Sequence, residues 1–190
     1  MDINDGWSQE GQLSRFGVIT DTFGICSGDS ILDLGCGHAA LLPFLLQRVG
    51  HIKYTGIDID AEKIKWAEHE ARARGCGYPP DWVKFRSGDV LVDSMEPADW
   101  VVANGVVSVK NSRNTSDMFK LVGKVWELCE QGAVVTVLRW PPDKTKANSE
   151  MNRFDPALIA WMLPEDCHFW KIDASYRDND FALFMFRSQR

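Results

Sequence analysis

The sequence lacks the features of several large classes of protein. Its five cysteines are odd in number, widely spaced and without a C-x-x-C pair, so neither a disulfide framework nor a zinc site is expected. No apolar run approaches the roughly 20 residues of a membrane span. The first ten residues are polar and acidic, without the apolar core of a signal peptide. We therefore expect a cytoplasmic protein with free thiols and no metal.

A cluster of lysine and arginine is also missing. The formal net charge is −6, whereas a chain that grips long nucleic acid through its phosphates usually presents a basic face. Apolar residues make up 45% of the 190 residues, which is enough for one α/β core. We expect a single domain over residues 1–190 that binds neither nucleic acid nor membrane; its oligomeric state is left open.

The stretch 30–40 is the segment around which we interpret the rest of the sequence. Its first residues predict a short buried strand at 31–34, and the apolar run 39–49 predicts a helix. Gly35 and Gly37 between them predict a tight turn. Glycine lets the backbone approach a ligand closely, and the free N–H groups of the first helical turn point at it. This order of features predicts a cofactor cradle.

Strands and helices alternate along the rest of the chain, which predicts a parallel sheet with helices on both faces and an antiparallel hairpin at the end. Gly132 is expected to cap a predicted helix over residues 115–130. The predicted elements are an amphipathic N-terminal helix with Leu13, Phe16, Ile19 and Phe23 on one face, strands at 51–57, 82–86, 99–103 and 133–138, helices from 61 and over 115–130, a short helix at 156–163, and hairpin strands at 168–176 and 181–187.

Within the domain, three regions have different predicted roles. Residues 1–28 form a helical region that either packs simply on the sheet or covers the cofactor as a lid, with Arg15 reaching a carboxylate. Residues 29–138 form the cofactor-binding core. Residues 139–190 comprise a long polar loop, the short helix and the hairpin.

Polar side chains follow four consecutive predicted strands, where ligands bind in such sheets. Asp58 lies 21 residues past Gly37 and can accept hydrogen bonds from both ribose hydroxyls, with Ile59 against the base; its alternative role is a helix cap. Asp89 can accept from the amino group of adenine, and its alternative is a turn residue. Asn104 ends the fourth strand.

Asp33 helps to decide which nucleotide the cradle fits. A carboxylate in a buried strand is costly without partners, so Asp33 either orders the turn or meets a cationic group of the ligand. A dinucleotide fingerprint needs a third glycine where this chain has Ala40. Asp33 would also repel a pyrophosphate, so a zwitterionic sulfonium ligand suits the turn better.

The four segments ILDLGCGHA, YTGIDID, FRSGDV and ADWVVANGVV resemble the four motifs of class I S-adenosylmethionine-dependent methyltransferases, in order over about residues 11–187. The resemblance implies a Rossmann-like, doubly wound α/β fold with a seven-stranded sheet, mostly parallel with an antiparallel C-terminal hairpin strand. It implies S-adenosylmethionine as cofactor. Arg15-Phe16, VVANGVVSVK and SYRDNDFALFMF further resemble a small bacterial subgroup of mostly unassigned substrate.

The resemblance also assigns positions in the cofactor site. Two residues depart from the family pattern: Ala39 replaces the usual third glycine of the first motif, and Asn104 stands where the subgroup often has serine. The implied contacts are Gly35, Cys36 and Gly37 beneath the methionine part, Asp58 at the ribose, Ile59 at the adenine face, Asp89 at the adenine amino group with Val90 beside it, and Asn104 near the methionine amino group.

No general base is evident, because His168 and His38 are each more typical of structural histidines. The base-gripping motif of amino-methylating DNA enzymes is absent after the fourth strand. We therefore predict methyl transfer to an oxygen or nitrogen atom of a small molecule. In the loop 139–153, Trp140, Lys144 and Lys146 are candidates for binding it, or simply solvated. The alternatives are a non-catalytic module that binds the same cofactor, and an NAD-dependent oxidoreductase.

Overall fold

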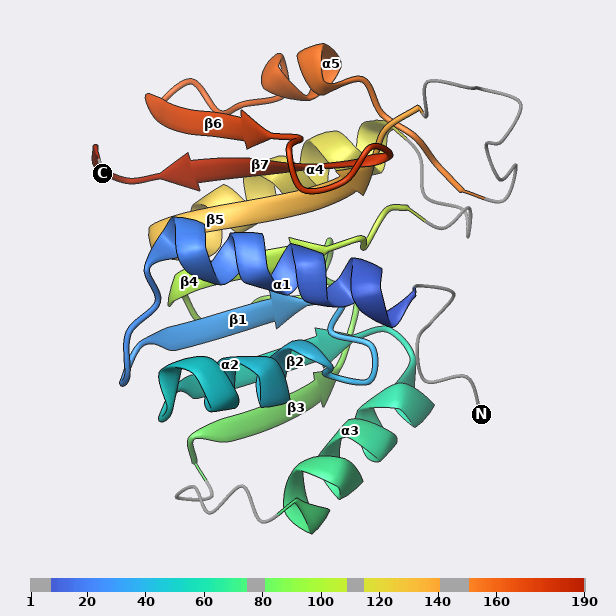
Figure 1. Ribbon diagram of the computed structural model, residues 1–190, viewed down its shortest axis with the longest axis vertical. Helices are drawn as coiled ribbons and strands as arrows, with labels where there is room; N and C mark the ends of the chain where they lie inside the picture. The colour runs from blue at the N-terminus through green and yellow to red at the C-terminus, as the bar shows by residue number, and fades with distance from the viewer. Residues whose placement is uncertain (1–7, 75–80, 109–114, 141–150, 190) are drawn as a thin grey trace.

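A seven-stranded sheet forms the centre of the computed structural model, which describes residues 8–74, 81–108, 115–140 and 151–189 (Figure 1). The strands are β1 (Ser30–Leu34), β2 (Lys53–Asp58), β3 (Val83–Ser87), β4 (Ala98–Asn104), β5 (Cys129–Leu138), β6 (Phe169–Asp173) and β7 (Asp180–Phe186). Their order in the sheet is β3-β2-β1-β4-β5-β7-β6. The first five are parallel, and β7 pairs antiparallel with both β5 and β6. The predicted α/β fold with an antiparallel C-terminal hairpin is confirmed.

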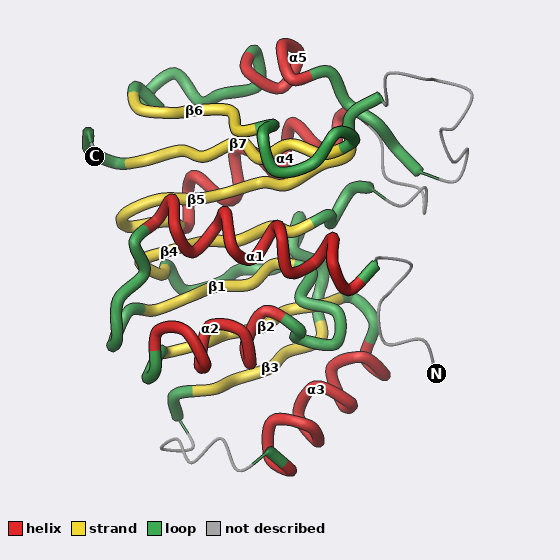
Figure 2. Tube along the Cα trace, in the orientation of Figure 1, coloured by secondary structure: helices red, strands yellow, loops and turns green. Residues whose placement is uncertain are grey.

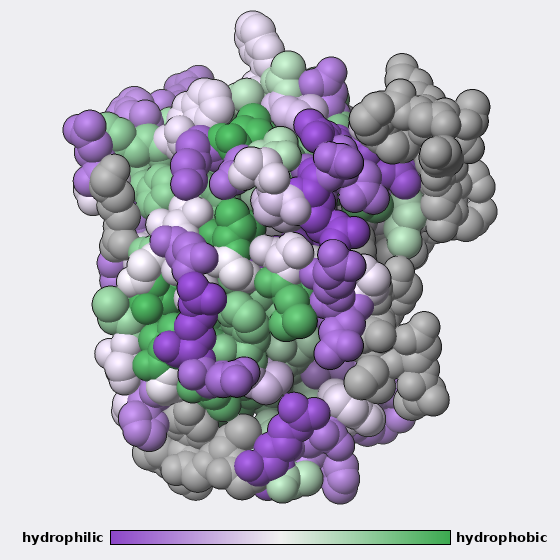
Figure 3. All heavy atoms as spheres, in the orientation of Figure 1, coloured by the Kyte–Doolittle hydropathy of each residue, from purple (hydrophilic) through white to green (hydrophobic). Residues whose placement is uncertain are grey.

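Helices cover both faces of this sheet. They are α1 (Gln9–Phe23), α2 (Leu41–Val49), α3 (Ala61–Ala73), α4 (Thr115–Leu128) and α5 (Pro156–Ala160). The first three lie on one face, and α4 and α5 on the other (Figure 2). On the face that carries α1 and α2, apolar and polar side chains are interspersed (Figure 3). Within the described ranges, no helix has both the length and the hydrophobicity of a membrane span.

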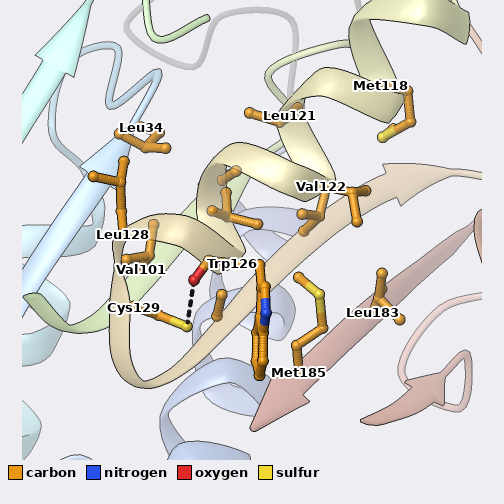
Figure 4. Close-up of a cluster of buried hydrophobic side chains, with 14 of the residues drawn as sticks. Leu34, Val101, Met118, Leu121, Val122, Trp126, Leu128, Cys129, Leu183 and Met185 are labelled. Carbon is orange, nitrogen blue, oxygen red and sulfur yellow. Dashed lines mark hydrogen bonds between the residues drawn. The ribbon is translucent and has the colours of Figure 1, made fainter. Parts of the chain in front are cut away.

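The alternation of side chains along the strands divides the core into two layers. In β1, Leu32 and Leu34 point to the face of α4, whereas Ile31 packs on the side of α1 and α2. Spacings of three and four place the apolar stripe of α4 against the sheet, as predicted. Figure 4 shows this layer, in which Met118, Leu121, Val122 and Trp126 of α4 lie over Leu34, Val101, Leu183 and Met185 of the strands.

Helix α1 packs on the sheet beside α2. Ser8 caps its first turn, and Gly24, with a φ of 63°, ends it. Phe16 and Phe23 are buried, and the ring of Phe23 stacks on Trp100 with 4.6 Å between centroids. Leu13, predicted on the buried face, is 48% exposed and lines a cavity between α1, α2 and α3. This is the simple packing that the sequence allowed; a role for α1 as a lid stays a prediction.

Two predicted helix ends are wrong. The helix after the glycine turn begins at Leu41 rather than Ala39, since Ala39 has a left-handed φ of 54°. The helix predicted over 115–130 ends at Leu128, and β5 begins at once with Cys129. Gly132 therefore lies inside a strand and caps no helix. A Cβ at Gly132 would lie 2.8 Å from the carbonyl oxygen of Met185, so the residue permits close packing of β7.

We expect Gly132→Ala to lower the free energy of unfolding by about 1–3 kcal/mol, because the backbone of β7 cannot yield to the added methyl group. The matched control is Gly123→Ala in α4, where no atom lies within 4 Å of the added Cβ. That change should stabilise by about 0.5–1 kcal/mol through helix propensity. Urea denaturation of both variants measures the two effects. Equal stability of Gly132→Ala and the unmutated chain would contradict the packing argument.

Candidate cofactor site

The order of the strands reverses at β1, which lies between β2 and β4. In an open parallel sheet, ligands bind outside the carboxyl ends of the strands at such a reversal. The ends of β1, β2 and β4 come together there. The structure thus brings the residues after Leu34, Asp58 and Ala103 to one edge of the sheet.

The glycine turn after β1 is hydrogen-bonded to the end of β2. The backbone N–H groups of Gly35 and Cys36 both donate to the carbonyl oxygen of Ile57, at 2.7 and 2.9 Å. Gly35 and Gly37 have positive φ values of 70° and 54°. A Cβ at Gly35 would lie 2.7 Å from Cγ2 of Val106, so a side chain there would collide with the loop after β4. The turn therefore requires glycine for both its conformation and its packing.

Asp58 joins this turn to the start of α3. Its Oδ2 accepts from the N–H of Gly37 at 2.8 Å, and its Oδ1 accepts from the N–H of Asp60 at 2.9 Å. Asp60 itself caps α3, since its Oδ1 accepts from Glu62 and Lys63. The alternative role of Asp58 as a helix cap is thus taken by Asp60. Asp58 is 8% exposed and lies at the carboxyl edge.

Ala39 closes the same turn in an unfavourable conformation. A left-handed backbone at an L-residue costs roughly 1–2 kcal/mol, because Cβ approaches the following carbonyl oxygen. Ala39 is the only non-glycine residue with a positive φ in the described part of the chain, and it is buried. At Ala39 the backbone therefore has a positive φ, a conformation that glycine adopts more readily than alanine.

Asp33 lies buried behind the turn, on the side of the sheet that carries α1 and α2. Tyr54 Oη donates to Asp33 Oδ2 at 2.5 Å, and both side chains are almost fully buried. Burial raises the pKa of Asp33 to about 7; the hydrogen bond from Tyr54 opposes this, and the charge of Asp58 adds to it. Burial and the nearby acids also raise the pKa of Tyr54 and of the Cys36 thiol.

The loop after β3 is joined to this edge as well. The N–H of Gly88 donates to the carbonyl oxygen of Asp58 at 2.9 Å. Asp89 Oδ1 accepts from the N–H of Leu91 at 2.9 Å, which is the turn contact that the sequence allowed as its alternative role. Val90 is buried, whereas Ile59, directly after Asp58, is 60% exposed.

Asn104 ends β4 beside Thr136 of β5. Thr136 Oγ1 donates to Asn104 Oδ1 at 2.5 Å, and Thr136 is fully buried. Gly105 follows with a φ of 75° and donates its N–H to the carbonyl oxygen of Thr136 at 3.1 Å. The amide of Asn104 is therefore held in a fixed orientation at the carboxyl edge.

Arg15 forms a buried ion pair with Asp180 at the start of β7. Tyr176 Oη also donates to Asp180, at 3.2 Å to Oδ1. Burial raises the pKa of Asp180, and the guanidinium of Arg15 opposes that shift. Arg15 thus has a carboxylate partner within the protein, supplied by β7. A contact between Arg15 and the cofactor stays a prediction.

A family model described as a methyltransferase domain matches residues 32–135 of the chain, which include Asp33, the glycine turn, Asp58, Asp89 and Asn104. The chain belongs to this family. The resemblance seen in the four sequence motifs is thereby confirmed, and with it S-adenosylmethionine as the cofactor of the family.

Two curated relatives of this methyltransferase domain are also methyltransferases. The chloroplastic 2-phytyl-1,4-beta-naphthoquinone methyltransferase of Arabidopsis thaliana is 26% identical over 143 residues, which cover 74% of this chain and 50% of that protein. The uncharacterized methyltransferase YdaC of Bacillus subtilis is 23% identical over 137 residues, covering 72% and 70%. The chain spans half the length of the Arabidopsis protein.

Solved structures share the fold at lower identity. Magnesium protoporphyrin IX methyltransferase of Synechocystis, with bound SAH, superposes with a TM-score of 0.70 at 15% identity, covering 97% of this chain and 90% of that one. Geranyl diphosphate C-methyltransferase of Streptomyces coelicolor gives 0.71 at 14% identity, covering 98% and 85%. The cyclase SpnF gives 0.72 at 14% identity, covering 97% and 85%. At these identities the likeness shows the fold alone.

The histidines of the methyltransferase domain lie away from the strand ends or pack against neighbours. His168 is exposed between α5 and β6. His38 lies edge-on against Trp66, with 5.0 Å between ring centroids, and lines a cavity of about 300 Å³ between α1, α2 and α3. Trp140, another candidate, is 51% exposed. Lys144 and Lys146 lie outside the described residues, as does most of the loop 139–153.

The sequence did not indicate three of the residues that hold this site: Tyr54, Thr136 and Asp180. The parallel register pairs Asp33 with Gly56, which places Tyr54 on the same face two residues earlier. Thr136 of β5 is paired directly with Asn104 of β4. A strand alignment would have found these two. The pairing of Asp180 with Arg15 depends on β7 returning beside α1, and no local sequence pattern predicts that position.

We expect Asp33→Asn to stabilise the ligand-free protein above pH 7. The folded state holds the pKa of Asp33 at about 7, against 3.8 for an ordinary aspartate. The unfolded chain therefore ionises first, and folding stability falls as the pH rises between these values. A shift of this size corresponds to at most about 4 kcal/mol. The advantage of the variant should be absent at pH 4 and largest at pH 8.

The control for this prediction is Asp99→Asn. Burial acts to raise the pKa of Asp99, but hydrogen bonds from Ser30 and Gln131 outweigh it and lower the pKa. Its stabilising charge is present above the unfolded pKa, so this variant should lose stability at pH 8. Urea titrations at pH 4, 6 and 8 compare the two. A pH-independent effect of Asp33→Asn would contradict the burial of a titrating carboxyl.

Proposed function

We propose that this chain transfers the methyl group of S-adenosylmethionine to an oxygen or nitrogen atom of a small molecule. The observation that carries the proposal is the acidic, glycine-rich edge. Asp58 holds the glycine turn through Gly37, Asp33 lies behind the turn, and the loop after β3 hydrogen-bonds to the same strand end. Carboxylates suit a ligand with cationic groups and would repel a pyrophosphate.

The same edge supports the contacts proposed for the cofactor. Each carboxylate oxygen of Asp58 accepts one backbone N–H and keeps capacity for a second donor, so both can meet ribose hydroxyls. Exposed Ile59 offers an apolar surface to the flat adenine. The remaining proposed contacts are Gly35, Cys36 and Gly37 along the methionine part, Asp89 and Val90 at the adenine edge, Asn104 at the amino end, and Arg15 at the carboxylate.

The cofactor supplies an electrophilic methyl carbon on a positively charged sulfur. The chain's own residues bind and orient it, and they hold the acceptor about 3 Å behind that carbon, in line with the leaving sulfur. A general base is required only when the acceptor keeps its proton at neutral pH. The arrangement therefore favours catalysis by alignment, and we assign no catalytic base.

A small molecule is the proposed acceptor. The Synechocystis and Streptomyces enzymes that share the fold are named for a porphyrin and for geranyl diphosphate. The net charge of −6 disfavours binding to nucleic acid phosphates. A reducing, cytoplasmic compartment belongs to the proposal, because Cys26, Cys36, Cys129 and Cys167 are free thiols.

The decisive experiment has two parts. Calorimetry measures binding of S-adenosylmethionine, S-adenosylhomocysteine and NAD to the full chain. Transfer of label from methyl-labelled S-adenosylmethionine into a pool of small metabolites then tests catalysis, and the labelled product identifies the acceptor atom. Binding of both sulfur ligands without transfer would favour a non-catalytic module. Binding of NAD without the sulfur ligands would overturn the proposal.

Asp58→Ala should weaken S-adenosylmethionine binding at least tenfold, or about 1.4 kcal/mol, because both the ribose acceptor and the anchor of Gly37 are removed. The matched control is Asp60→Ala two residues later. It removes the cap of α3 and should cost about 1 kcal/mol of stability while leaving the dissociation constant within twofold. Calorimetry of both variants decides; an unchanged constant for Asp58→Ala would mean that the ribose binds elsewhere.

A further inference from the structure

Tyr54 is the one donor that the described residues provide to the Asp33 side chain. Its hydroxyl reaches Oδ2 at 2.5 Å, and no described residue hydrogen-bonds to Oδ1. Tyr54 is 1% exposed and Asp33 3%. The side chains of both residues are therefore shielded from water. Oδ1 of Asp33 can still accept a hydrogen bond from a further donor.

The groups around Asp33 are mostly acidic. Asp58 lies at the end of the same strand as Tyr54, and the Cys36 thiol lies in the turn. Lys63 of α3 is a nearby cation, and its charge lowers the pKa of the Cys36 thiol. On the other side of β1, the residue paired with Asp33 is Val102, which is uncharged. Apart from the ligand, the Tyr54 hydroxyl is thus the main group that favours a charged Asp33.

We propose that Tyr54 is a positioning residue of the cofactor site, whose hydroxyl holds the Asp33 carboxylate oriented and charged behind the glycine turn so that it favours the cationic end of the cofactor. The inference rests on the proposed function. Tyr54 acts through Asp33 and touches no reacting atom. Without its hydroxyl, the proton stays on Asp33 over a wider pH range, and attraction for the sulfonium is lost there.

The proposal predicts a pH signature that a purely structural role would not give. Below the titration of Asp33 the carboxyl is neutral with or without Tyr54, so Tyr54→Phe has no effect there. Above it, Asp33 is charged in the unmutated chain and still largely neutral in the variant. The ratio of the two dissociation constants at each pH also cancels the titration of the cofactor itself.

The experiment compares Tyr54→Phe with the unmutated chain by calorimetry from pH 5.5 to 8.5. For S-adenosylmethionine, we expect the ratio of dissociation constants to rise from near one to about fivefold at pH 8. For S-adenosylhomocysteine, which lacks the sulfonium charge, the rise should be smaller. In an Asp33→Asn background, Tyr54→Phe should leave the constant unchanged, because the two residues act as one unit.

Phe85→Leu is the matched packing control. The Phe85 ring lies 5.9 Å from that of Tyr54, so its loss disturbs packing and leaves the hydroxyl in place. This variant should melt at a lower temperature and keep the unmutated pH profile. A flat ratio for Tyr54→Phe, or the same profile in the Asp33→Asn background, would overturn the proposal. Absence of any S-adenosylmethionine binding by the unmutated chain would instead reject the proposed function.

Discussion

The carboxylate of Asp58 holds together the edge on which the rest of the site depends. It accepts one N–H from the turn after β1 and one from the residue that caps α3. Hydrogen bonds to a charged acceptor are among the stronger ones in proteins. A single side chain thereby links the glycine turn after β1 to the residue that caps α3.

The second constraint is electrostatic. The site places the carboxyls of Asp33 and Asp58 near one another at a largely buried edge, an arrangement that opposes ionisation of Asp33. A protein gains no stability from such a pair. A cation that binds beside it relieves the repulsion. If the edge binds the cofactor as proposed, the unfavourable charge of the free protein becomes part of the affinity for the sulfonium ligand.

Much of this could be predicted from the sequence, because the signals are local. Alternating strands and helices, glycines at a turn and acids after strands indicate the sheet, its carboxyl edge and Asp58. The errors also have physical causes. Ala39 resembles a helical residue but is held left-handed by the turn, and Gly132 resembles a helix cap but accommodates β7. Tyr54 reads as an ordinary strand aromatic, because its role depends on a neighbouring strand.

The left-handed alanine in the turn shows where the shape of the cradle comes from. A residue that disfavours its own conformation is held there by its surroundings, here the hydrogen bonds from Gly35 and Cys36 to Ile57 and from Gly37 to Asp58. The conformation of the turn therefore depends on contacts with β2 as well as on its own residues. Residues 30–41 grafted alone onto another scaffold would not keep this geometry, and the graft would have to include β2 as well.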